Sequence, residues 1–128
     1  MSEVAQLKAR IDDAAMDIER SYENSLKSVR EAKEKINDLE LSISQKEHLS
    51  RKDSQALSSA IDNLNELTDS LILRSGRVEQ EYERLEQECR THMPQPAGMD
   101  NLRVVCGKTR ELAMNLLCFS LAHFKRKA

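Results

Sequence analysis

The sequence predicts an all-α protein built on a long coiled-coil helix, and three observations lead to this class. Charged residues make up 33% of the 128 residues and aromatic residues only 3%, and there are just three Gly and two Pro. Most of the apolar residues are Leu, Ile, Val and Ala, and they recur every three or four positions. Good helix formers with few helix breakers favour long helices over a sheet. The regular apolar stripe argues against a disordered chain.

The first element expected is a long helix over residues 1–92, because two apolar seams follow a seven-residue repeat there. One seam runs from Ala15 to Leu85, and its companion runs from Val4 to Leu39. This a/d pattern buries a narrow stripe between supercoiled helices. We therefore predict an oligomer seam formed by Ile11, Ile18, Tyr22, Val29, Ile36, Leu39, Ile43, Leu57, Ile61, Leu64, Leu71, Val78, Tyr82 and Leu85.

The companion seam is interrupted over residues 45–56, where it fails at Lys46 and Asp53 and resumes one residue later at Ile61. Such a discontinuity can lie inside one continuous helix. Alternatively, Ser50 caps a new helix with Asp53 three residues on, and the chain turns back as a hairpin near residues 45–54. Because no Gly, Pro or Asn marks a turn in this window, we favour the continuous helix. Residues 2–92 would then form a rod of about 135 Å, which needs a second chain to cover its seam.

The second element expected is a Pro/Gly elbow over residues 93–99. Pro94 and Pro96 cannot continue a helix and make a short, stiff connector. After it, Asp100 or Asn101 can cap another helix. We expect this helix to span residues 100–128.

This C-terminal helix is apolar nearly all round from Leu112 onward, which is typical of a helix with neighbours on every side. Because the elbow is short, the helix should pack back antiparallel along residues 70–92. One neighbour cannot cover all of its apolar side chains, so we predict that it also binds partner proteins. The residues expected to do so are Leu112, Leu116, Leu117, Phe119, Leu121 and Phe124.

Charge is unevenly distributed along the chain. The net charge is −2, but residues 1–99 carry 14 Lys and Arg against 20 Asp and Glu, whereas residues 100–128 carry 6 against 2. This asymmetry favours charge matching within or between chains. The terminal Lys125–Lys127 run could instead contact nucleic acid or an anionic membrane. The total charge argues against a general nucleic-acid binder.

No catalytic motif occurs in the chain: we find no nucleotide loop, paired catalytic carboxylates, nucleophile elbow or metalloprotease His pair. We therefore predict no enzyme, no cofactor and no small-molecule substrate. Cys89, His92, Cys118 and His123 are of the residue types that bind structural zinc. Their spacing is not that of known zinc sites, and Cys is a common buried residue, so we interpret them as packing residues and predict no metal.

We expect a cytoplasmic or nuclear protein, because there is no signal-peptide pattern and no apolar run near the ~20 residues of a membrane span. The odd number of cysteines, three, predicts no disulfide framework. The function expected is that of a non-enzymatic structural or scaffold subunit of a multiprotein assembly, of the cytoskeletal, kinetochore or vesicle-tethering type, as a homodimer or hetero-oligomer. One alternative is a small helical chaperone or adaptor that shields a partner helix. A second is a dimeric coil that presents its basic tail to nucleic acid or membrane.

Overall fold

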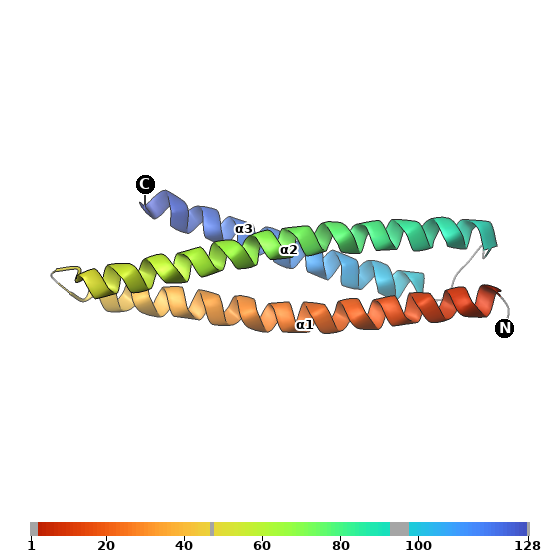
Figure 1. Ribbon diagram of the computed structural model, residues 1–128, viewed down its shortest axis with the longest axis horizontal. Coiled ribbons are helices and arrows are strands. Elements are labelled where there is room, and N and C mark those ends of the chain that lie inside the picture. The colour runs from red at the N-terminus through yellow and green to blue at the C-terminus, as the bar shows by residue number, and fades with distance from the viewer. Residues whose placement is uncertain (1–2, 47, 93–97, 128) are drawn as a thin grey trace.

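The protein is a bundle of three α-helices (Figure 1). The computed structural model describes residues 3–46, 48–92 and 98–127, and the side chains of 3–46, 48–91 and 98–122. Helix α1 spans Glu3–Ser44, α2 spans Arg51–His92, and α3 spans Met99–Lys127. The all-α class, the long helices and the shorter C-terminal helix packing back on them are confirmed.

The favoured prediction of one continuous helix over residues 2–92 is wrong, because α1 and α2 form a hairpin. The chain turns between Ser44 and Arg51 without Gly or Pro. The backbone N–H of Asp53 donates to the Ser50 hydroxyl over 3.1 Å, and that of Ser54 donates to the Ser50 carbonyl over 3.0 Å, so Ser50 caps α2. Lys46 Nζ lies 2.7 Å from a carboxylate oxygen of Asp53 and bridges the turn.

The absence of Gly, Pro and Asn had argued against a hairpin. The turn forms without them because side chains cap the start of α2. The Lys46 ammonium and the Ser50 hydroxyl, both bound to the Asp53 carboxylate, lower its pKa below the usual value. The second seam fails at Lys46 and Asp53, and the helix breaks in this same stretch. Each arm of 42 residues is about 63 Å long, roughly half the length of the expected rod.

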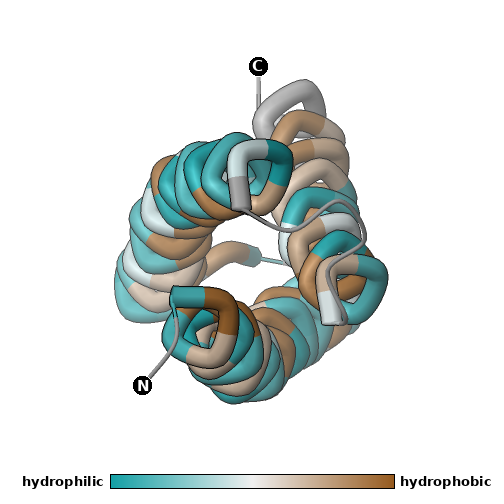
Figure 2. Tube along the Cα trace, turned by 90° about the vertical axis from the view of Figure 1, so that its right-hand side faces the viewer, coloured by the Kyte–Doolittle hydropathy of each residue, from teal (hydrophilic) through white to brown (hydrophobic). Residues whose placement is uncertain are grey.

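Helix α3 lies against both arms, antiparallel to α2 and parallel to α1. The Ser120 hydroxyl donates to the Asn65 side-chain oxygen over 2.8 Å, and Cys106 Sγ lies 3.9 Å from the Val78 carbonyl oxygen. The α2 residue numbers thus fall as those of α3 rise. The antiparallel packing along residues 70–92 is confirmed, and the contact extends further, to Asn65. Figure 2, viewed along the bundle, shows the three helices around a common centre.

The start of α3 differs from the prediction, since neither Asp100 nor Asn101 caps it. The helix already begins at Met99, and the Leu102 N–H donates to the carbonyl of Gly98 over 3.0 Å. Gly98 has a φ of 95°, which L-residues rarely adopt, and its α-carbon approaches α1 closely. Most of the expected elbow, residues 93–97, lies outside the described residues.

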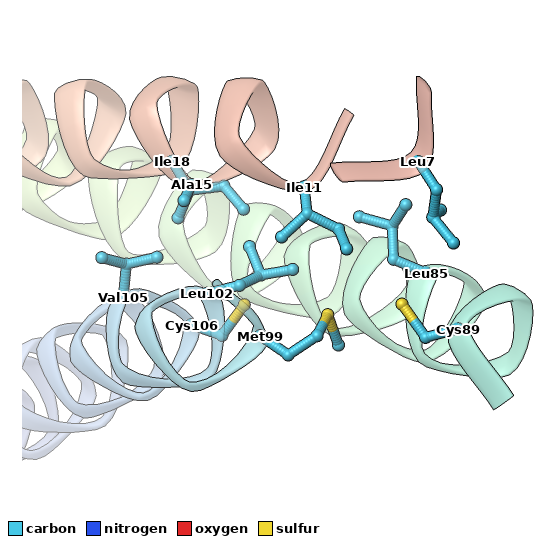
Figure 3. Close-up of a cluster of buried hydrophobic side chains, with 10 residues drawn as sticks. All are labelled: Leu7, Ile11, Ala15, Ile18, Leu85, Cys89, Met99, Leu102, Val105 and Cys106. Carbon is cyan, nitrogen blue, oxygen red and sulfur yellow. The ribbon is translucent and has the colours of Figure 1, made fainter. Parts of the chain in front are cut away.

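Two apolar clusters form the core. The first joins the open end of the hairpin to the start of α3 and includes Ile11, Leu85, Cys89 and Leu102 (Figure 3). The second lies toward the turn and is centred on residues such as Leu64. Between the clusters, each helix contributes a buried polar residue: Ser25 from α1, Ser75 from α2 and Thr109 from α3.

Candidate functional site

The predicted oligomer seam lies inside a single chain. Eight of its residues are buried between the three helices: Ile11, Ile18, Val29, Ile36, Ile61, Leu64, Leu71 and Leu85. Tyr22, Leu39, Leu57, Val78 and Tyr82 are partly buried and pack against the same core, and Ile43 is partly buried near the turn. The hairpin and α3 cover the seam, so its burial does not require a second chain.

Ion pairs within the chain link α3 to both arms. Arg110 of α3 pairs with Glu79 of α2 at 3.0 Å, and Lys108 pairs with Glu19 of α1 at 3.7 Å. Lys108 also lies over the Tyr22 ring, 5.8 Å from its centre. Exposed ion pairs of this kind stabilise a fold by at most about 1 kcal/mol each, so they orient α3 more than they hold it in place.

The six residues predicted to bind partners occupy different faces of α3. Leu112 and Leu116 are buried in the core, at 8% and 0% exposure. Phe119 packs partly against the core, and Lys33 of α1 lies over its ring, 5.1 Å from the centre. Leu117 is partly exposed, and Leu121 is 52% exposed. The Phe124 side chain lies outside the described residues.

After packing against two helices, α3 still presents a second apolar stripe to the outside. Met114, Leu117, Cys118 and Leu121 are spaced i, i+3, i+4 and i+7, which places them on one face of a helix. Met114 is 54% exposed and Cys118 is exposed. We call these four residues the outer stripe. Met114 was not singled out from the sequence, and Cys118 was interpreted only as a packing residue, because only the position of the core shows which side of α3 faces outward.

Apolar surface next to the outer stripe continues on α2. Ile72 of α2 is 43% exposed and lies seven residues after Asn65, whose side chain contacts α3 through Ser120. Residues seven apart lie nearly above one another on a helix. Ile72 therefore extends the apolar surface of the outer stripe onto α2.

The cysteines do not gather as a zinc site would require. Cys89 belongs to the cluster at the open end of the hairpin, whereas Cys118 is two residues from Ser120, which contacts Asn65. Cys89 and Asn65 are 24 residues apart on α2, about 36 Å at 1.5 Å per residue. Antiparallel packing thus separates the two Cys-His pairs, whose His92 and His123 side chains lie outside the described residues. Within the described part of the chain, no three or more His, Cys, Asp and Glu residues are placed to hold a metal ion.

Burial gives Cys89 and Cys106 weakly acidic thiols. Loss of solvation raises the pKa of Cys106 to about 11, with the nearby Glu79 carboxylate acting in the same direction. Burial also raises the pKa of Cys89, assisted by Glu88 and Glu86. Thiols of this kind are poor nucleophiles near neutral pH, and Figure 3 shows both beside Met99 in the core. Their arrangement is that of packing residues.

No protein-family model, curated protein or solved structure matches the chain. Among the described residues, no helix combines the length and the apolar character that crossing a membrane requires. The features available for a functional interpretation are therefore the bundle itself and its outer stripe.

Proposed function

We propose that this chain is a non-enzymatic scaffold or adaptor subunit that binds another protein by helix packing on the outer stripe. One observation supports the proposal: α3 is covered by both arms of the hairpin and still exposes a second apolar face. Exposed apolar residues at i, i+3, i+4 and i+7 are the side chains with which a helix packs against another helix. Contiguous exposed apolar surface of this kind is typical of protein-binding sites.

The hairpin favours a compact adaptor over an extended spacer. A continuous helix would have kept two binding sites more than 100 Å apart, whereas each arm here is about 63 Å long. The adaptor alternative required a hairpin and an apolar face on the C-terminal helix, and both are present. We therefore propose that the chain shields a partner's amphipathic helix within a multiprotein assembly.

A paired substitution tests this function. Met114→Ser with Leu121→Ser removes apolar side chains that are more than half exposed, so the melting temperature should change by no more than a few degrees. The control is Met16→Ser with Leu41→Ser, two residues of α1 that are 60% and 62% exposed. A photo-crosslinker in place of Cys118 should identify the partner, which is then purified and titrated against each variant.

We expect the Met114 and Leu121 variant to lose most of its affinity for that partner, and the control to retain it. Burial of two such side chains contributes about 1.5–3 kcal/mol each when complete, so a loss of at least tenfold is expected. Equal affinity of the two variants would contradict the proposal. So would a crosslinker at position 118 that captures no other protein.

A further inference from the structure

Beside the outer stripe, α2 exposes a row of acidic residues. Asp62, Glu66 and Asp69 are spaced i, i+4 and i+7, so they follow one face of the helix, and all three are exposed. No Lys or Arg occurs between Lys52 and Arg74. Among the described side chains, none forms an ion pair with any of the three carboxylates. Within the described side chains the row therefore carries three carboxylates without an ion-pair partner, and Lys35 of α1 lines the same groove as Glu66.

Two residues of the row, Asp62 and Asp69, belong to the same side of the bundle as the outer stripe, whereas Glu66 lines the groove between α2 and α1. Asp62 lies three residues before Asn65 and Asp69 lies four residues after it, so both share the face of α2 that contains Asn65. The hydrogen bond from Ser120 to Asn65 joins this face to α3, between Leu117 and Leu121. An occupant of the outer stripe would thus have the carboxylates of Asp62 and Asp69 along one edge.

From this arrangement we infer that the partner segment is a basic amphipathic helix. Its apolar residues pack on Met114, Leu117, Leu121 and Ile72, and its Lys or Arg residues face Asp62 and Asp69. Like charges at a helix interface exclude wrong partners, and opposite charges set the orientation of the right one. An acidic helix on the same surface would meet the carboxylates of Asp62 and Asp69 and be repelled by them. The inference rests on the proposed function and specifies its partner.

Two designed peptides of 21 residues provide the probe. Both carry Leu at the a and d positions of three heptads, one has Lys at e and g, and the other has Glu there. Each is labelled with a dye, and its fluorescence anisotropy is titrated with the full chain at low salt. We expect the Lys peptide to bind about tenfold more tightly than the Glu peptide, because the exposed carboxylates attract the first and repel the second. Raising the salt concentration should reduce this difference.

The decisive variant reverses the charges of the row with Asp62→Lys, Glu66→Lys and Asp69→Lys. We expect it to prefer the Glu peptide. The control changes the same net charge elsewhere, with Asp13→Lys, Asp17→Lys and Glu23→Lys on exposed positions of α1, and should keep the preference for the Lys peptide. The Met114→Ser, Leu121→Ser variant should bind neither peptide, because the apolar contacts are lost.

Three results would overturn the inference. The first is equal binding of both peptides, or of neither, to the unaltered chain. The second is a charge-reversed variant that still prefers the Lys peptide. The third is a dimer of the unaltered chain in sedimentation velocity that becomes a monomer in the Met114→Ser, Leu121→Ser variant. A second copy of the chain would then occupy the outer stripe. If the crosslinked partner requires the outer stripe but is insensitive to the charge reversal, the proposed function stands and only the basic character of its helix is refuted.

Discussion

At the scale of single residues, burial sorts three chemically identical thiols into two classes. Cys89 is 2% exposed and Cys106 is 7% exposed, whereas Cys118 lies on the outer stripe. The sequence indicated only that the cysteines were odd in number and irregularly spaced. The accessibility of each thiol depends on where its residue lies relative to the core, and the sequence pattern does not give that position.

Thiol labelling should resolve these classes. With a disulfide reagent at pH 8, we expect one thiol per folded chain to react rapidly and three after unfolding, because Cys106 with a pKa of about 11 is almost wholly protonated and covered. Cys118→Ser should abolish the rapid phase. Rapid reaction of two or more thiols in the native chain would contradict the assigned burial.

The raised pKa of Cys106 also has a consequence for stability. Its ordinary value is 9.0, so the unfolded chain loses this proton at a lower pH than the folded one. The buried, protonated thiol therefore makes its full contribution to the free energy of unfolding below pH 9. This contribution is lost as the pH rises toward about 11. In Cys106→Ala, the fall in stability across this range should be smaller than in the unaltered chain.

At the scale of the helices, capping and glycine geometry decide where each element begins. The Ser50 hydroxyl starts α2, and Gly98 starts α3 with a backbone conformation that suits glycine. Gly76, in contrast, lies inside α2 in an ordinary helical conformation. A β-carbon there would have no neighbour within 4 Å, whereas one at Gly98 would lie 3.3 Å from Ile11 and 3.1 Å from Asp12.

The two glycines should therefore respond oppositely to alanine. Gly76→Ala adds helix propensity without a clash and should stabilise the bundle by about 0.5–1 kcal/mol. Gly98→Ala places a side chain in a strained conformation against α1 and should destabilise it by about 1–2 kcal/mol. Urea unfolding at constant pH measures both changes. If Gly98→Ala were neutral, the close approach of residue 98 to Ile11 would be disproved.

At the scale of the whole molecule, the hairpin brings the two ends of the heptad region together. Arg10 and Glu88 are 78 residues apart and form an ion pair at 2.6 Å between the side-chain nitrogen and oxygen. In a continuous helix the same residues would lie about 117 Å apart. The distance between residues near the open end of the hairpin therefore distinguishes the folded bundle from a continuous rod.

Spin labels at exposed residues 9 and 87, in a Cys118→Ser background, test this directly. Packed helices are 8–10 Å apart, so the labels should lie within about 25 Å of each other. Dilution with unlabelled chain should leave the distance unchanged, because both labels belong to one molecule. A distance near 117 Å, or a short distance that disappears on dilution, would exclude the intramolecular hairpin.

The sequence by itself determined the helical class and the inward positions of both arms. Residues such as Ile36 and Leu64 recur at alternating spacings of three and four, and in a helix this spacing selects one face whatever covers it. The antiparallel return of α3 was likewise expected, from the short connection between the two helices. The interrupted seam at Lys46 and Asp53 located a discontinuity, but it did not decide between a turn and a continuous helix.

Only the tertiary structure decided that the seam closes within one chain. A heptad pattern is the same for a partner helix in the same molecule or in another, and the turn depends on the Ser50 cap instead of on Gly or Pro. The tertiary structure also divided the apolar residues of α3 into core and surface. Because α3 is apolar nearly all round, its own pattern favours no face. Only its contact with the two arms decides that Leu116 is buried and Leu121 is exposed.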